Sequence, residues 1–155
     1  MNTFAKTITT WFGCGYSPIA PGTVGSLGAC GCVIILHSIF GYKWMMMLLI
    51  FGIIIFTILG IKLTNVLENL WGKDPSKIVV DEVVGLWIAF LFVPFSYINL
   101  LIAFVLFRFF DILKPLGIRK LESLDGGLGV MADDILAGIY ANLILQAFLY
   151  GKQFI

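Results

Sequence analysis

The chain has 155 residues, of which 60% are hydrophobic and only 12% are charged, and its mean hydropathy is +1.02. A soluble domain usually carries about 25% charged residues and is at most about half apolar, so this composition favours one domain that uses a lipid bilayer as part of its solvent. The net charge of +1 gives no reason to expect a nucleic acid partner. The three cysteines lie in apolar sequence and are interpreted as reduced, space-filling residues.

The first predicted element is a short amphipathic helix at residues 1–12. Four large apolar residues share one of its faces, at positions 4, 8, 11 and 12, as in helices that lie at a membrane interface. The segment lacks the compact apolar core of a cleavable signal peptide, so we expect the membrane segments to stay in the mature protein. Residues 13–26 hold four glycines and two prolines and predict a loop.

Two long apolar segments follow, at residues 27–40 and 44–61, with a turn predicted at Gly41-Tyr42-Lys43. A helix needs about 20 apolar residues to cross the hydrocarbon core, so the two segments predict a slightly short transmembrane hairpin. Helical periodicity continues to Trp71, and Asp74-Pro75 offers a cap and a first-turn proline for the next helix.

Residues 83–107 are 25 in a row without charge, interrupted near Pro94. One continuous span would separate Asp81 from Arg108 across the membrane, whereas a hairpin at Pro94 keeps both on one side. Each arm of such a hairpin would be about 16 Å long at a rise of 1.5 Å per residue, which is too short to cross. We therefore expect a re-entrant helical hairpin at 83–107, packed inside the bundle rather than against lipid.

The last third of the chain is predicted to extend the second arm to Leu113, where Pro115 stops it. A polar, glycine-rich connection at residues 116–132 and a final apolar helix at residues 135–151 complete the chain. The fold class expected from these elements is all-α, an integral membrane bundle of about six helices that forms a single domain over residues 1–155.

This topology places all nine acidic residues and eight of the ten basic residues on one side of the membrane, with Lys43 and Lys152 opposite. The positive-inside rule makes the charged side cytoplasmic. Acidic residues carry little topological weight, so their gathering needs another reason, and a functional site is the obvious one.

Several kinds of site are excluded by the residues that are missing. The single histidine, His37, lies within an apolar segment, which leaves no histidine for a histidine-dependent hydrolase. No arginine follows Cys14 at the spacing of a cysteine phosphatase, and the sequence has no H-E-x-x-H, C-x-x-C or G-x-S-x-G motif. The chemistry that remains is that of oxygen ligands.

Five carboxylates border the apolar helices: Asp81, Glu82, Asp111, Asp133 and Asp134. Oxygen ligands without histidine or cysteine favour Mg²⁺, Mn²⁺ or Ca²⁺. The alternative is that the acidic pairs are ordinary helix N-terminal residues favoured by the macrodipole. A glycine follows one acid of each pair by four residues, at positions 85 and 138, and would let the two helices approach closely.

Three charged residues, Arg108, Asp111 and Lys114, are spaced by three along one helical face. The two bases could hold phosphate oxygens while Asp111 joins a metal site, or the set could be a helical salt bridge. The glycine cluster at residues 126–129 resembles a phosphate cradle before a helix start, although such clusters are also ordinary turns.

Four motifs together resemble the phosphatidylglycerophosphatase A family, in that family's order and with similar spacing. They are S-P-I-A-P-G-T-V-G-S at 17–26, I-V-V-D-E-V-V-G at 78–85, F-R-F-F-D-I-L-K-P at 107–115 and G-G-L-G-V-M-A-D-D-I-L-A-G at 126–138. One departure is L-G-I at 116–118, where relatives often have a second proline.

The resemblance implies a Mg²⁺-dependent phosphatase of the bacterial inner membrane that hydrolyses phosphatidylglycerophosphate to phosphatidylglycerol and phosphate. It also implies an all-helical bundle around a central helix. We expect a multi-pass protein whose site faces the cytoplasm and whose partners are the phospholipid substrate and the membrane. A phosphatidyl transferase is disfavoured because its D-G-x-x-A-R motif is missing, and a non-enzymatic divalent-cation carrier is the other alternative.

The expected site residues fall into three groups. Metal ligands are expected at Asp81, Glu82, Asp133 and Asp134. The expected catalytic group consists of these four residues and Asp111. Substrate-binding residues are expected at Thr23, Ser26, Arg108, Lys114, Gly127 and Gly129. A metal-activated water is the simplest nucleophile, and an aspartate that forms a phosphoenzyme is the alternative.

Overall fold

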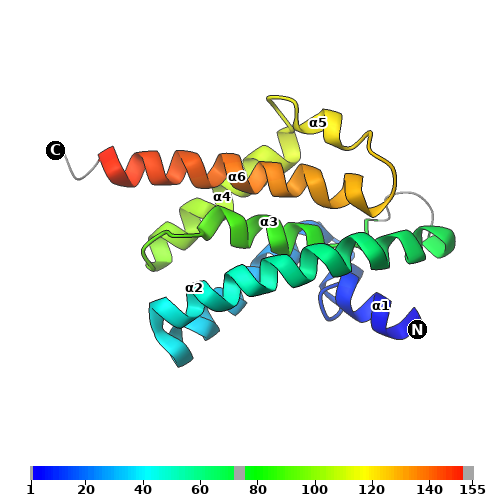
Figure 1. Ribbon diagram of the computed structural model, residues 1–155, viewed down its shortest axis with the longest axis horizontal. Coiled ribbons are helices and arrows are strands. Elements are labelled where there is room, and N and C mark those ends of the chain that lie inside the picture. Colours follow the sequence, from blue (N-terminus) through cyan, green and yellow to red (C-terminus); the bar gives the residue numbers. More distant parts are fainter. Residues whose placement is uncertain (1, 72–75, 152–155) are drawn as a thin grey trace.

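The computed structural model describes residues 2–71 and 76–151, and over these residues the chain is helical without any strand (Figure 1). The α-helices are α1 (Asn2–Thr9), α2 (Pro21–Trp71), α3 (Val80–Phe90), α4 (Tyr97–Leu113), α5 (Ile118–Leu121) and α6 (Gly127–Gly151), and one 3₁₀ turn, η1, covers Cys14–Tyr16. The all-α prediction is confirmed. The helix start predicted at Asp74-Pro75 lies outside the described residues.

Helix α1 is shorter than the helix predicted at residues 1–12. It ends at Thr9, and Trp11 and Phe12 adopt left-handed backbone angles, with φ of 46° and 53°. The two rings still touch edge to face, but Trp11 is buried against Trp87 while Phe12 is exposed. The prediction that both belong to one helical face was therefore wrong.

Helix α2 is two helices joined at Gly41, where the backbone is not helical (φ 72°, ψ 175°). Glycine adopts this angle without a Cβ clash, and the chain reverses there to form a hairpin (Figure 1). The predicted turn is confirmed in position, although the first arm begins earlier than expected, at Pro21. By length and composition, α2 and α6 are the two described helices that could cross a membrane.

Helix α3 is the buried centre of the structure. Nine of its 11 residues are buried, and it lies between α2 and α6 while also contacting α4 (Figure 1). Its C-terminal end stays inside the protein because Asn142 of α6 donates hydrogen bonds to the carbonyls of Ala89 and Leu91, at 3.0 and 2.8 Å. A helix can end in such a place only when its last carbonyls find partners.

The short helical hairpin predicted at 83–107 is present as α3 and α4, but only α3 is packed inside the bundle as predicted, because α4 has just 4 buried residues among its 17. The chain turns between Phe90 and Tyr97, and Ser96 caps α4 by accepting a hydrogen bond from the Asn99 N–H. This turn and the Gly41 turn lie at the left of Figure 1, whereas α6 begins at the right. The start of α3 and the end of α4 thus lie at the same end of the bundle.

Helix α6 begins at Gly127, eight residues before the predicted start at Ile135. The glycine-rich sequence was predicted as a connection, but Gly127 and Gly129 form the first turn of the helix. Their missing side chains let the helix end pack tightly, since an added Cβ would collide with the carbonyl of Ile61 or of Leu124. The prediction was wrong because the contact of Gly127 with Ile61 joins residues that are distant in sequence.

Candidate active site

One pocket of about 320 Å³ lies where the N-terminal ends of α2, α3 and α6 meet the C-terminal end of α4. Each helix N-terminus carries a partial positive charge that favours anions. The residues that line the pocket are Ala20, Pro21, Gly22, Glu68, Ser76, Ile78, Asp81, Glu82, Arg108, Asp111, Lys114, Glu122, Leu124, Gly126, Gly129, Val130, Asp133 and Asp134. All the charged residues expected at the site are among them.

Helix α3 supplies the first acidic pair in its first turn. Asp81 is 8% exposed, and one of its oxygens accepts the N–H of Glu82 at 3.1 Å. Burial, followed by the neighbouring Glu82 carboxylate, raises the pKa of Asp81 well above its ordinary value. Burial also raises the pKa of Glu82. A positive charge bound beside them would therefore stabilise the ionised form of both carboxylates.

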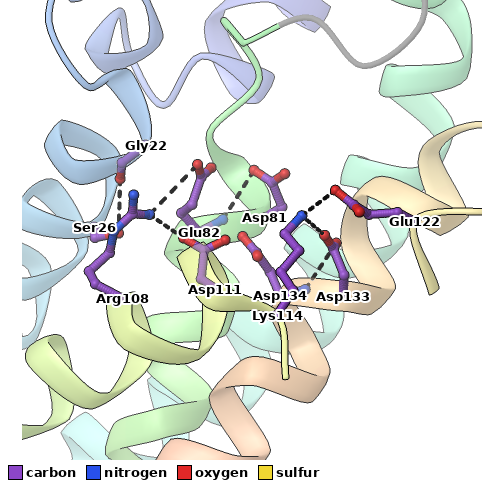
Figure 2. A network of polar contacts seen from close by, with 10 residues as sticks. All are labelled: Gly22, Ser26, Asp81, Glu82, Arg108, Asp111, Lys114, Glu122, Asp133 and Asp134. Atoms are coloured by element: carbon purple, nitrogen blue, oxygen red, sulfur yellow. Dashed lines mark hydrogen bonds and ion pairs between the residues drawn. The ribbon is translucent and has the colours of Figure 1, made fainter. Parts of the chain in front are cut away.

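The second acidic pair, Asp133 and Asp134, is buried in α6. Its two members have different partners. Asp134 faces α3, and one oxygen each from Asp81, Glu82 and Asp134 lie within 4.8 Å of one another, an arrangement that could hold a metal ion. Asp133 instead contacts the Lys114 ammonium at 2.6 Å (Figure 2). The structure thus gathers three of the four expected metal ligands and pairs the fourth with a base.

The three gathered carboxylates fit a hard divalent cation. Oxygen donors alone favour Mg²⁺, Mn²⁺ or Ca²⁺. Glu82 Oε2 is also buried with no hydrogen-bond partner among the described residues. A buried carboxylate oxygen is costly in that condition, and a cation bound by Asp81, Glu82 and Asp134 would satisfy it.

The two bases come from the C-terminal end of α4 and lie on opposite sides of the acidic group (Figure 2). Arg108 Nη1 lies 2.5 Å from Asp111 and 3.9 Å from Glu82. Lys114 follows α4 in a left-handed conformation and contacts Asp133 and Glu122. Burial lowers the pKa of Lys114, but its hydrogen bonds to the two carboxylates outweigh that effect and raise the pKa above its ordinary value.

Residues 17–26 were predicted as part of a loop, but from Pro21 onward they form the start of α2, and they reach the pocket through their backbone. Gly22 lies so close to the site that an added Cβ would collide with the Glu82 carboxylate and lie tightly against the Arg108 guanidinium. The side chains expected to bind substrate, Thr23 and Ser26, are not part of the pocket wall, and Ser26 donates its hydroxyl hydrogen bond to the Gly22 carbonyl at 2.9 Å. Gly22 directly follows the proline that begins α2, and this glycine is the sequence signal for the close approach.

In the glycine cluster, the backbone N–H groups of Gly127 and Gly129 already have hydrogen-bond partners, so they do not form a free phosphate-binding site. The Gly127 N–H donates to Asn65 Oδ1 at 2.6 Å, and the Gly129 N–H donates to the Gly126 carbonyl at 3.0 Å. Gly126 and Gly129 line the pocket, whereas Gly127 does not. Glu68 and Glu122 line the pocket and Asn65 holds the Gly127 N–H, and none of these three residues was predicted from the sequence.

The pocket is strongly acidic. Seven carboxylates line it, from Glu68, Asp81, Glu82, Asp111, Glu122, Asp133 and Asp134, against two bases. With all groups in their ordinary charge states this leaves an excess of five negative charges. An anionic substrate would be repelled unless cations enter with it.

Comparison with known proteins decides the family. The family model for phosphatidylglycerophosphatase A matches residues 7–149, which is nearly the whole chain. The chain belongs to the phosphatidylglycerophosphatase A family. In this member of the phosphatidylglycerophosphatase A family, the four motifs noted in the sequence all contribute residues to the one pocket. Membership supports a lipid phosphatase.

Three relatives agree on phospholipid phosphatase names but differ in the substrate named. A protein from Bacteroides thetaiotaomicron, 47% identical over 89% of both chains, is provisionally named phosphatidylinositol-3-phosphatase. Proteins from Haemophilus influenzae (41% identical; 90% of this chain, 85% of the relative) and Escherichia coli (35%; 86% and 77%) are named phosphatidylglycerophosphatase A. No solved structure was found to match the chain of this phosphatidylglycerophosphatase A family member.

Proposed function

We propose that the protein is a Mg²⁺-dependent lipid phosphatase that hydrolyses phosphatidylglycerophosphate to phosphatidylglycerol and phosphate. The observation that carries this proposal is the gathering of Asp81, Glu82 and Asp134 beside Arg108 and Lys114, in a chain of the phosphatidylglycerophosphatase A family. Enzymes that transfer phosphoryl groups commonly combine carboxylates that hold a divalent cation with basic side chains that bind phosphate.

The chain's own residues have distinct tasks in this proposal. Asp81, Glu82 and Asp134 would hold Mg²⁺, with Asp133 as a further candidate, and the ion would polarise the phosphoryl oxygens. Arg108 and Lys114 neutralise the negative charge that develops on the phosphoryl group, and the backbone of Gly22 and Gly129, which line the pocket, lies beside the headgroup.

The simplest reaction is attack by water on phosphorus, in line with the leaving oxygen. Asp111 or Glu82 accepts the proton of the water, the phosphorus–oxygen bond to the lipid breaks, and the lipid alkoxide takes a proton as it leaves. The alternative is attack by a pocket carboxylate, which forms an aspartyl-phosphate that water later hydrolyses. Rapid quenching separates the two, since only the second gives a trapped phosphoenzyme.

The same proposal places the protein in the bacterial inner membrane as a multi-pass, single-domain enzyme over residues 1–155, with the pocket at the cytoplasmic face. The apolar helices α2 and α6 and the basic residues at the pocket end support this orientation. Cysteines introduced near Pro94 and near Asp81 should label from opposite sides if the hairpin crosses, and a Pro94 cysteine that resists periplasmic label would keep α3 and α4 re-entrant.

The deciding experiment measures phosphate release from phosphatidylglycerophosphate by purified protein, with Mg²⁺ and with excess chelator. We expect release that requires the metal. Phosphatidylinositol-3-phosphate is the matched second substrate, because a relative 47% identical carries that name. Folded protein that releases no phosphate from either lipid would contradict the proposal and favour a cation carrier, and transfer of the phosphatidyl group to an alcohol would favour a transferase.

A further inference from the structure

Glu122 is the one pocket carboxylate that contacts a base and is also open to solvent. It caps the C-terminal end of α5, and its oxygen lies 2.5 Å from Lys114 Nζ. Asp133 contacts the same ammonium at 2.6 Å. The two carboxylates differ in burial, since the Glu122 side chain is 41% exposed and the Asp133 side chain 6%.

The two partners of Lys114 also lie in different kinds of segment. Asp133 lies within α6, a helix of 25 residues packed against α3 and α4. Glu122 lies in a short surface segment between Gly117 and Gly126, whose backbones are both left-handed, with φ of 88° and 66°. An exposed ion pair is weak because water competes for both charges, so Glu122 is the partner that can leave.

A phosphate that reaches Lys114 must compete with these carboxylates. An ammonium has three N–H groups, and in the structure the two carboxylates use two of them. A phosphate monoester carries up to two negative charges shared over three oxygens, so it attracts an ammonium more strongly than one carboxylate does. Exchange of Glu122 for a phosphate oxygen would leave the contact between Lys114 and Asp133 intact.

We propose that Glu122 is a latch that holds the Lys114 ammonium until the substrate phosphate takes its place. The inference rests on the proposed phosphatase function. Glu122 is a positioning residue, because it acts on substrate through Lys114. Its return to Lys114 after hydrolysis helps to displace inorganic phosphate, so the latch weakens the binding of substrate phosphate and product phosphate by the same factor.

The test compares Glu122→Gln with the wild-type protein at saturating Mg²⁺. The first measurement is equilibrium binding of inorganic phosphate, and the second is KM and kcat for phosphatidylglycerophosphate. Asp125→Asn is the matched control, because Asp125 is exposed in the same segment and is not among the residues that line the pocket. Thermal unfolding checks that the variants are folded.

We expect Glu122→Gln to bind inorganic phosphate about two- to fivefold more tightly, the factor typical of an exposed ion pair, and to lower KM by the same factor. The value of kcat should not rise, because phosphate leaves more slowly. Asp125→Asn should leave both constants unchanged.

Phosphate binding that is unchanged or weaker in Glu122→Gln would overturn the latch, and so would equal tightening in Asp125→Asn, since loss of charge alone would then explain the effect. The binding measurement needs no catalysis. A wild-type protein that binds phosphate but hydrolyses no lipid would contradict the proposed function. The ratio of the phosphate binding constants of Glu122→Gln and wild type would still test the latch.

Discussion

Gly85 of α3 and Gly138 of α6 lie against each other where the two helices cross. A Cβ atom added to Gly138 would collide with the Gly85 carbonyl, and one added to Gly85 would meet Phe107 and the carbonyl of Asp134. Each glycine lies four residues after a site acid, Asp81 or Asp134. Contact between the two backbones therefore sets the distance between the two acidic helix ends.

The first prediction concerns this crossing. Gly138→Ala should separate α3 from α6, lower the free energy of unfolding by about 1–3 kcal/mol through overpacking, and reduce kcat about 100-fold through misplacement of the carboxylates. Activity and thermal unfolding measure the two effects.

The matched control for that experiment is Gly31→Ala, because Gly31 lies within helix α2 and an added Cβ there meets nothing within 4 Å. Wild-type activity in Gly138→Ala would show that the helix spacing does not control the site.

Much of this arrangement could be predicted from local sequence. Periodicity and glycine or proline positions gave the reversals at Gly41 and near Pro94, and the repeated spacing from acid to glycine gave the close approach of α3 and α6. These features depend on neighbouring residues, or on two segments with the same pattern, so a single sequence contains them.

The features that the sequence did not reveal depend on distant partners. The start of α6 was placed too late because Gly127 packs on Ile61, a contact absent from any local pattern. The different partners of Asp133 and Asp134 depend on where Lys114 points after α4 ends. Glu122 had no spacing relation to the other charged residues, and only the folded chain brings it to Lys114.

The second prediction concerns the stability of the metal-free protein. Burial raises the pKa of Asp81 in the folded state above its unfolded value, so the folded state binds more protons and its stability falls as the pH rises above about 4. In chelator at neutral pH, Asp81→Asn should therefore have a higher Tm than wild type, by about 2–4 °C for each kcal/mol relieved.

The stabilisation by Asp81→Asn should shrink as the pH falls towards 4, and Mg²⁺ should raise the Tm of wild type more than that of the variant. The variant should also lose phosphatase activity. A Tm below that of wild type in chelator would mean that the Asp81 carboxylate is satisfied without a metal.

The third prediction concerns the geometry of Arg108. Its guanidinium contacts Asp111 at 2.5 Å and lies 3.9 Å from Glu82, while Nε is buried without a hydrogen-bond partner in the described part of the chain. Lysine keeps the charge but loses the planar set of donors. Arg108→Lys should lower kcat by about 100-fold, as loss of a preorganised donor does. Steady-state kinetics that show an effect on KM alone would assign Arg108 to substrate binding rather than to the transition state.

The fourth prediction separates the adjacent acids Asp133 and Asp134. Asp134 lies with Asp81 and Glu82, whereas Asp133 contacts Lys114. Asp134→Asn should raise the Mg²⁺ concentration for half-maximal activity at least about tenfold, since loss of a residue that only orients a metal ligand already weakens metal binding about 10- to 100-fold.

Asp133→Asn should instead change phosphate affinity, because Lys114 loses its buried partner, while the Mg²⁺ requirement stays close to that of wild type. Each variant serves as the control of the other, since both remove one charge from neighbouring positions of α6. Titrations of activity against Mg²⁺ and against lipid substrate measure the two constants. Equal shifts in the Mg²⁺ requirement for both variants would show that Asp133 leaves Lys114 and joins the metal when substrate is bound.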